Sequence, residues 1–140
     1  MKVNVRNYEQ MRAWLAVMVP EVFPEWRPET DPIKFLDDTA AVSPANARKG
    51  LAMAINDSVD LAEDWAADRV AAIDDRLSNQ GLPTLTDIRA TFSREIQRVV
   101  RRGRIASEVE YYAVRNAVEM PGSDADSLWQ LLEAYEQQQA

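Results

Sequence analysis

Apolar side chains recur every three or four residues between Pro44 and Pro83, and no proline interrupts this stretch. That spacing places them along one face of an α-helix, and their roughly 11-residue repeat suits a nearly straight one. We therefore expect one long central helix over residues 44–78, or two collinear helices joined at residues 56–58, whose polar side chains compete for backbone hydrogen bonds. The apolar positions are Leu51, Ile55, Val59, Ala62, Ala66, Val70, Ile73 and Leu77.

Start and stop signals predict shorter helices before this segment. A first amphipathic helix is expected from about residue 8 to residue 19, and Pro20 ends or kinks it. Residues 20–32 combine four prolines with aromatic residues, which predicts an ordered strap rather than a helix. Asp31-Pro32 then opens a short helix, because aspartate caps a helix start and proline suits the first helical position.

Two capping sequences mark helix starts in the second half of the chain. Thr84 and Asp87 resemble a capping box and begin a helix that Gly103 ends. Ser107 and Glu110 match a full capping box and begin the next helix. Both helices have apolar residues at helical spacing, so we expect both to pack on a common core.

A last helix is predicted after the breaker at residues 120–122, and the tail at residues 137–140 is expected to fray. The chain shows no internal repeat and no convincing strand. We therefore predict an all-α, single-domain helical bundle spanning residues 1–140, with five or six helices. The last helix is expected to bury Leu128, Trp129, Leu132 and Tyr135.

Two of the predicted helices carry opposite charge on the faces turned away from their apolar stripes. Residues 57–75 hold seven acidic residues and one arginine, whereas residues 84–105 hold six arginines and two acidic residues. Charge segregated in this way influences encounter and partner choice more than it influences the fold.

The acidic face is the first candidate partner-binding surface. In helical projection Asp57, Asp60, Asp64 and Asp68 lie opposite the apolar stripe, and Leu61 lies among them. An apolar side chain ringed by charge is typical of a hot spot for a basic partner. The alternative interpretation is a solvated helix face with one stray leucine.

The arginine-rich face is the second candidate surface. Arg94, Arg98 and Arg101 project together away from the apolar residues, and Arg102 follows at the helix end. Three interpretations stay open: complementing the negative C-terminal end of the helix dipole, contact with an acidic protein, and phosphate binding.

Composition narrows the chemistry. The chain contains neither histidine nor cysteine, so the commonest general base, thiol nucleophile and metal ligands are missing. Asp60, Glu63 and Asp64 have a spacing that suits oxygen ligands to Mg²⁺ or Mn²⁺, but no phosphate-binding loop accompanies them. We therefore predict no catalytic residues, no metal site and no cofactor.

These observations favour a small, cytoplasmic, bacterial protein that acts as a protein–protein interaction module, of which an immunity or antitoxin protein is one form. Self-association into a homodimer is a special case. The alternatives are a carboxylate-metal-dependent nucleotide hydrolase and a nucleic-acid-binding regulator, although the net charge of −7 disfavours nucleic acid. Neither a secretory signal nor a membrane span is expected, because no apolar run is long enough.

Overall fold

Seven α-helices make up the part of the chain that the computed structural model describes, residues 1–120 and 122–139, and these residues contain no β-strand. A short 3₁₀ turn, η1 (Pro28–Thr30), precedes the second helix. The helices are α1 (Tyr8–Val22), α2 (Pro32–Val42), α3 (Pro44–Leu61), α4 (Ala67–Asn79), α5 (Leu85–Arg102), α6 (Glu108–Val118) and α7 (Ala125–Gln139). The all-α prediction is confirmed, whereas the predicted five or six helices are too few.

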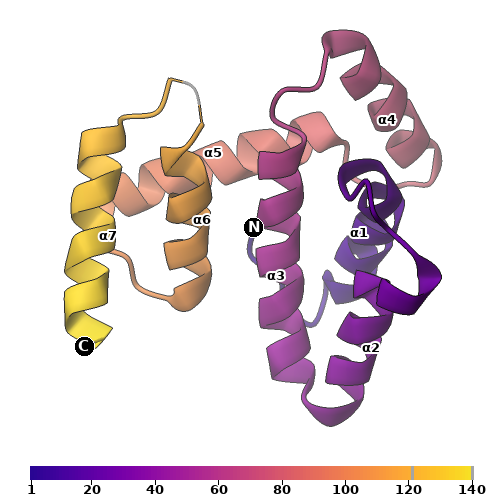
Figure 1. Ribbon diagram of the computed structural model, residues 1–140, viewed down its shortest axis with the longest axis horizontal. Helices are drawn as coiled ribbons and strands as arrows, with labels where there is room; N and C mark the ends of the chain where they lie inside the picture. Colours follow the sequence, from indigo (N-terminus) through magenta and orange to yellow (C-terminus); the bar gives the residue numbers. More distant parts are fainter. Residues whose placement is uncertain (121, 140) are drawn as a thin grey trace.

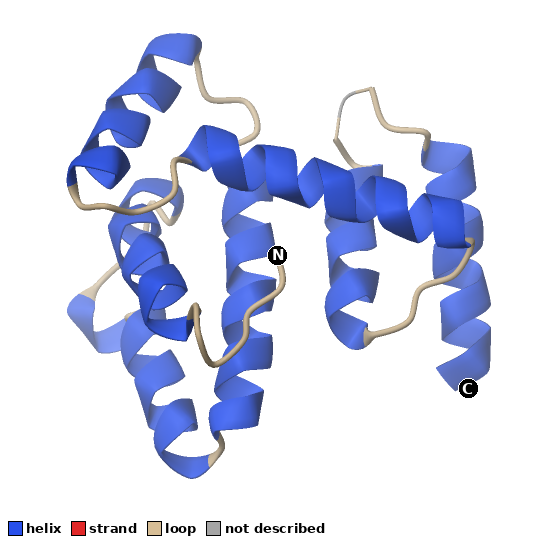
Figure 2. Ribbon diagram, turned by 180° about the vertical axis from the view of Figure 1, so that it is seen from behind, coloured by secondary structure: helices blue, strands red, loops and turns tan. Residues whose placement is uncertain are grey.

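Helix α3 is the central element. It packs against α1, α2, α5 and α6, while α7 packs mainly on α6. Figure 1 shows α1 and α2 on one side of α3 and α6 on the other, and Figure 2, which is seen from behind, shows α5 crossing in front of both groups. Helices α3 and α6 run parallel, so that their N-terminal halves lie at the same end.

The predicted long helix over residues 44–78 is wrong, because α3 ends at Leu61 and α4 begins at Ala67. Helix α4 leaves the axis of α3 and packs on α5, so the two are not collinear (Figure 1). The break also lies after the expected weak point, since residues 56–58 are helical and Asn56 and Ser58 are buried.

Charge explains where α3 stops. Its last turns carry Asp57 and Asp60, and negative charge is unfavourable at the negative C-terminal end of a helix dipole. Asp68 instead lies in the first turn of α4, where the dipole favours it. Arg89 of α5 donates a hydrogen bond from Nη2 to the carbonyl oxygen of Ala62 at 2.5 Å and so satisfies an acceptor at the end of α3.

Polar contacts dock α4 against its neighbours. Arg76 pairs with Glu21 at the end of α1 at 2.8 Å, and Arg69 donates to the backbone oxygen of Glu21 at 3.0 Å. Arg69 also stacks over the Trp65 ring, 3.8 Å from its centroid. These contacts hold α4 against the end of α1.

The predicted capping box is confirmed at the start of α5, whereas at the start of α6 only one of its two hydrogen bonds is present. The Thr84 and Asp87 box has both reciprocal hydrogen bonds. Ser107 accepts from the Glu110 backbone, but the Glu110 carboxylate accepts from the backbone of Ala106 and pairs with Arg102 instead of returning to Ser107. The ion pair with Arg102 of α5 therefore takes the place of the second hydrogen bond of the expected capping box.

Two other boundaries differ from the sequence expectations. Helix α1 continues through Pro20 to Val22, so only the later part of the predicted strap at residues 20–32 is non-helical before α2. Helix α7 continues through residue 139, so the expected frayed tail is helical as far as it is described. Residue 121 of the predicted breaker and residue 140 of the tail lie outside the described residues.

The core is built from apolar residues of all seven helices, but α7 contributes only a narrow stripe. Leu128 and Leu132 are buried, as expected, whereas Tyr135 is only half-buried. The prediction that Trp129 lies in the core is wrong, since 51% of this residue is exposed. It lies about 100° around the helix from the buried Leu128. Within the described part of the chain, no helix is both long and apolar enough to cross a membrane.

These exposures predict different outcomes for two substitutions in α7. Leu132→Ala should lower the free energy of unfolding by about 2–5 kcal/mol, because it empties a filled core position. Trp129→Ala should cost less than about 1 kcal/mol. Urea denaturation of both variants measures the difference, and equal costs would contradict the packing of α7 described here.

Candidate functional site

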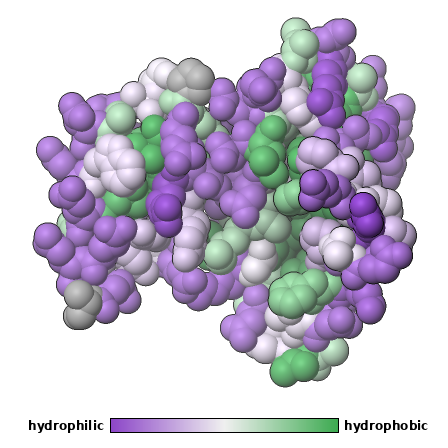
Figure 3. Space-filling model, viewed as in Figure 1, coloured by the Kyte–Doolittle hydropathy of each residue, from purple (hydrophilic) through white to green (hydrophobic). Residues whose placement is uncertain are grey.

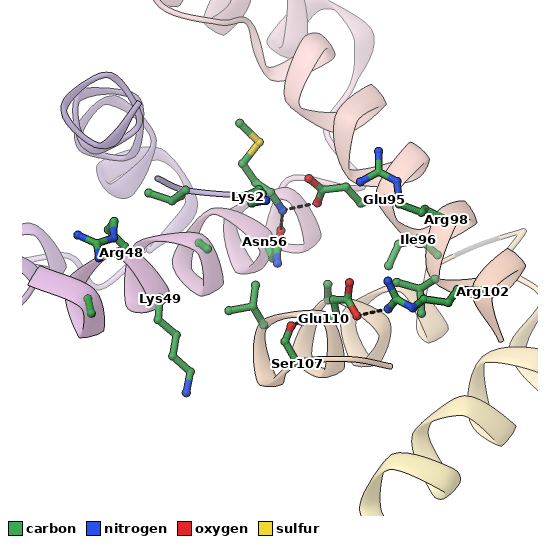
Figure 4. Close-up of a pocket in the computed structure, with 17 residues that line it drawn as sticks. Lys2, Arg48, Lys49, Asn56, Glu95, Ile96, Arg98, Arg102, Ser107 and Glu110 are labelled. Atoms are coloured by element: carbon green, nitrogen blue, oxygen red, sulfur yellow. Dashed lines mark hydrogen bonds and ion pairs between the residues drawn. The ribbon is translucent and has the colours of Figure 1, made fainter. Parts of the chain in front are cut away.

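A pocket of about 560 Å³ lies among the N-terminal segment, α3, α5 and α6 (Figure 4). Its size falls within the usual range of small-molecule sites. Part of its lining is apolar and comes from three helices: Ala45, Ala52, Ile96, Val99, Val109 and Ala113. Met1 and Val3 of the N-terminal segment also line it, and the other lining residues are polar and mostly basic.

Basic groups from several elements meet at this pocket, namely the Met1 amino group, Lys2, Arg48, Lys49, Arg98 and Arg102, with Glu95 and Glu110 as the acidic lining residues. Three of these cations are paired. The Met1 amino group lies 2.6 Å from Glu95, Lys49 lies 2.5 Å from Glu108, and Arg102 pairs with Glu110.

The other three pocket cations are uncompensated. Within the described residues, the side chains of Lys2, Arg48 and Arg98 make neither an ion pair nor a hydrogen bond. They belong to three separate elements, the N-terminal segment, α3 and α5. The pocket therefore has an excess of positive charge, although the whole chain is acidic.

Asn56 of α3 contributes a buried polar group to the pocket wall. The residue is 1% exposed, and its Oδ1 accepts a hydrogen bond from the Met1 amino group at 2.9 Å. Its Nδ2 has no partner among the described residues. An unsatisfied buried donor costs about 1–3 kcal/mol, which makes this amide unusual in a folded protein.

The structure divides the predicted arginine row into two groups. Arg98 and Arg102 line the pocket. Arg94 and Arg101 are exposed and do not line it, and Arg94 donates to the hydroxyl of Thr91 at 3.2 Å. Sequence projection found the arginines of α5, but it missed Lys2, Arg48 and Asn56, which the fold brings from distant positions.

A second charged site, the acidic cluster, consists of Asp57, Asp60, Glu63 and Glu119. Burial raises the pKa of Asp60 above its ordinary value, and the negative charges of Glu119, Glu63 and Asp57 raise it further. None of the four forms an ion pair within the described residues, although Asp57 accepts a hydrogen bond from Asn116 at 2.9 Å. Hydrophilic residues cover the neighbouring parts of α3 and α6 (Figure 3).

The rest of the predicted acidic row lies elsewhere. Leu61 is 46% exposed beside Asp60, as an apolar contact residue would be. Asp64 is exposed in the connection between α3 and α4, and Asp68 bonds to the backbone of Arg69 in α4. The break after α3 therefore separates the last two acids from the helix face on which the sequence places them.

The acids do not form a metal centre in the described residues. No group of three or more acidic side chains there is placed to hold a metal ion, and this includes Asp60, Glu63 and Asp64, whose spacing in the sequence suits such ligands. Comparisons with protein-family models, curated proteins and solved structures found no significant match to this chain. Arguments about function therefore rest on the two charged sites.

The raised pKa of Asp60 predicts that Asp60→Asn increases the stability of the folded protein and that this increase depends on pH. Because the folded protein binds this proton more tightly than the unfolded chain, ionisation of Asp60 costs stability at neutral pH. The asparagine variant should be more stable by about 0.5 kcal/mol, the size of a relieved like-charge contact.

The advantage of Asp60→Asn should fade as pH falls through the raised pKa and vanish below the ordinary value of 3.8, where folded and unfolded Asp60 are both protonated. Denaturation at several pH values measures it, with Asp75→Asn as the control for a charge lost elsewhere. An advantage that persists in acid would contradict the assignment.

Proposed function

We propose that this protein works by binding a basic protein through the acidic cluster, with Leu61 as the apolar contact beside it. The observation that carries this proposal is the electrostatic environment of Asp60. Its half-buried carboxylate lies near three other acids, and within the described residues no cation offsets them. A lysine or arginine from a partner would supply the missing charge.

The cost of holding these acids together supports a binding role. Asp60 and Glu119 lie near the C-terminal ends of α3 and α6, where helix dipoles also disfavour negative charge. Surfaces that bind are often kept at some expense in stability. Binding of a cationic partner would relieve the repulsion among these acids. The repulsion therefore favours cationic partners over others.

Charge also favours a basic partner over other macromolecules. The net charge of −7 attracts a basic protein from a distance and accelerates encounter, whereas it repels nucleic acid. Leu61 would then be desolvated within a ring of charged contacts, which is the arrangement of a hot spot. An immunity or antitoxin protein that neutralises a basic protein in the cytoplasm is one form of this proposal.

Cross-linking in the native host, followed by mass spectrometry, tests the proposal. We expect cross-links from the region around Asp60 and Leu61 to a basic protein. Calorimetry of the purified pair should then show affinity that falls as salt rises, because the contact is electrostatic. Cross-links confined to other faces, or a partner that is not basic, would contradict the proposal.

A matched pair of variants distinguishes the contribution of the acidic cluster to affinity from the contribution of net charge. The cluster variant carries Asp60→Asn, Glu63→Gln and Glu119→Gln. The control carries Glu9→Gln, Asp75→Asn and Glu133→Gln, which are exposed and make no ion pair in the described residues. Affinity should fall about tenfold or more only in the cluster variant. Equal losses would mean that net charge, not this cluster, governs binding.

A further inference from the structure

We infer that the pocket among the N-terminal segment, α3, α5 and α6 binds a small organic anion, in which a phosphate or carboxylate group is joined to an apolar body. This site shares no residue with the acidic cluster, which lies near and just beyond the C-terminal ends of α3 and α6. It goes beyond the proposed protein contact, because its ligand is a small molecule of the opposite charge to a basic partner.

The unpartnered amide of Asn56 is the first observation that points to a ligand. Buried donors are almost always satisfied, yet Nδ2 of Asn56, at the wall of the pocket, has no partner in the described part of the chain. Its Oδ1 is already occupied by the Met1 amino group, which fixes the side chain so that Nδ2 is held as the donor. An anion oxygen is the acceptor that this position needs.

The uncompensated cations are the second observation. Arg48 of α3, Arg98 of α5 and Lys2 of the N-terminal segment line the pocket, and Arg48 and Arg98 lie on opposite sides of it (Figure 4). In the same view Arg102 extends toward Glu110, while Lys49 extends away from the centre, in agreement with their ion pairs. Guanidinium groups suit planar, paired hydrogen bonds to phosphate or carboxylate oxygens.

Helix direction adds to this positive field. Ser107, Val109 and Glu110, at the N-terminal end of α6, line the pocket. The N-terminal end of a helix carries partial positive charge and favours anions. The two carboxylates of the lining do not oppose an anion strongly, because Glu95 and Glu110 are each paired with a cation.

The volume and the apolar lining define the rest of the ligand. A pocket of about 560 Å³ is far larger than an inorganic anion, so a bare phosphate ion would leave most of it empty. Ile96, Val99 and Val109 offer apolar surface beside the basic groups. The fitting ligand therefore has an apolar part against these side chains and an oxyanion near Asn56 and Arg98.

Two matched pairs of probes test this inference on the full chain, with any purification tag at the C-terminus. Octanoate is compared with octanol, and adenosine monophosphate with adenosine, by following ¹⁵N–¹H NMR spectra during titration. We expect a charged probe to shift the Asn56 side-chain amide saturably while its neutral counterpart does not. A response to octanoate alone identifies a carboxylate site, and a response to the nucleotide alone identifies a phosphate site.

Arginine variants provide the second test. Arg98→Gln should weaken binding of the responding probe about tenfold, because one charge-assisted contact is lost. Arg94→Gln, on the same helix but outside the pocket, should leave the affinity unchanged. Both side chains are exposed, so neither variant should disturb the fold. Equal binding of charged and neutral probes, no response of the Asn56 amide, or equal effects of the two variants would overturn the inference.

Discussion

The hydrogen bond from Arg89 to the carbonyl oxygen of Ala62 joins α5 to the end of α3, and the arrangement of the other helices depends on where α3 ends. Because α3 stops at Leu61, α4 turns away and reaches Glu21 of α1 through Arg69 and Arg76. Helix α5 then runs across α3 and α6, on the side that faces the viewer in Figure 2, and its Arg98 and Arg102 line the same pocket as residues of α6. A continuous helix through residue 78 would carry α5 away from this position, and the pocket would not form.

The parallel packing of α3 and α6 gives the protein its electrical polarity. Most of the pocket residues of both helices come from their N-terminal halves, although Asn56 lies farther along α3, whereas the acidic cluster lies near and just beyond their C-terminal ends. Helix dipoles add to the side-chain charge at both ends, since they make the first end more positive and the second more negative. One packed helix pair therefore positions two sites of opposite sign, and the two proposed ligands are oppositely charged for the same reason.

Local sequence predicted the features that local chemistry determines. The capping box at Thr84 and the helix end at Gly103 follow from residues within one turn, and the structure confirms them. Helical periodicity missed the break after α3, because Ala62 and Ala66 keep the apolar spacing across it. The concentration of acids before the break and Asp68 after it was the available signal. Projection likewise found Arg98, but Asn56 and Arg48 join it only through tertiary packing.

The distance between α3 and α4 tests this account most directly. The chain has no cysteine, so Asn46→Cys and Asp75→Cys allow specific spin labelling at two exposed positions. One continuous helix would place these residues about 44 Å apart, at 1.5 Å per residue. The account predicts that pulsed electron paramagnetic resonance will give a clearly shorter distance, because α4 turns back after Leu61. A distribution centred near 44 Å would contradict it.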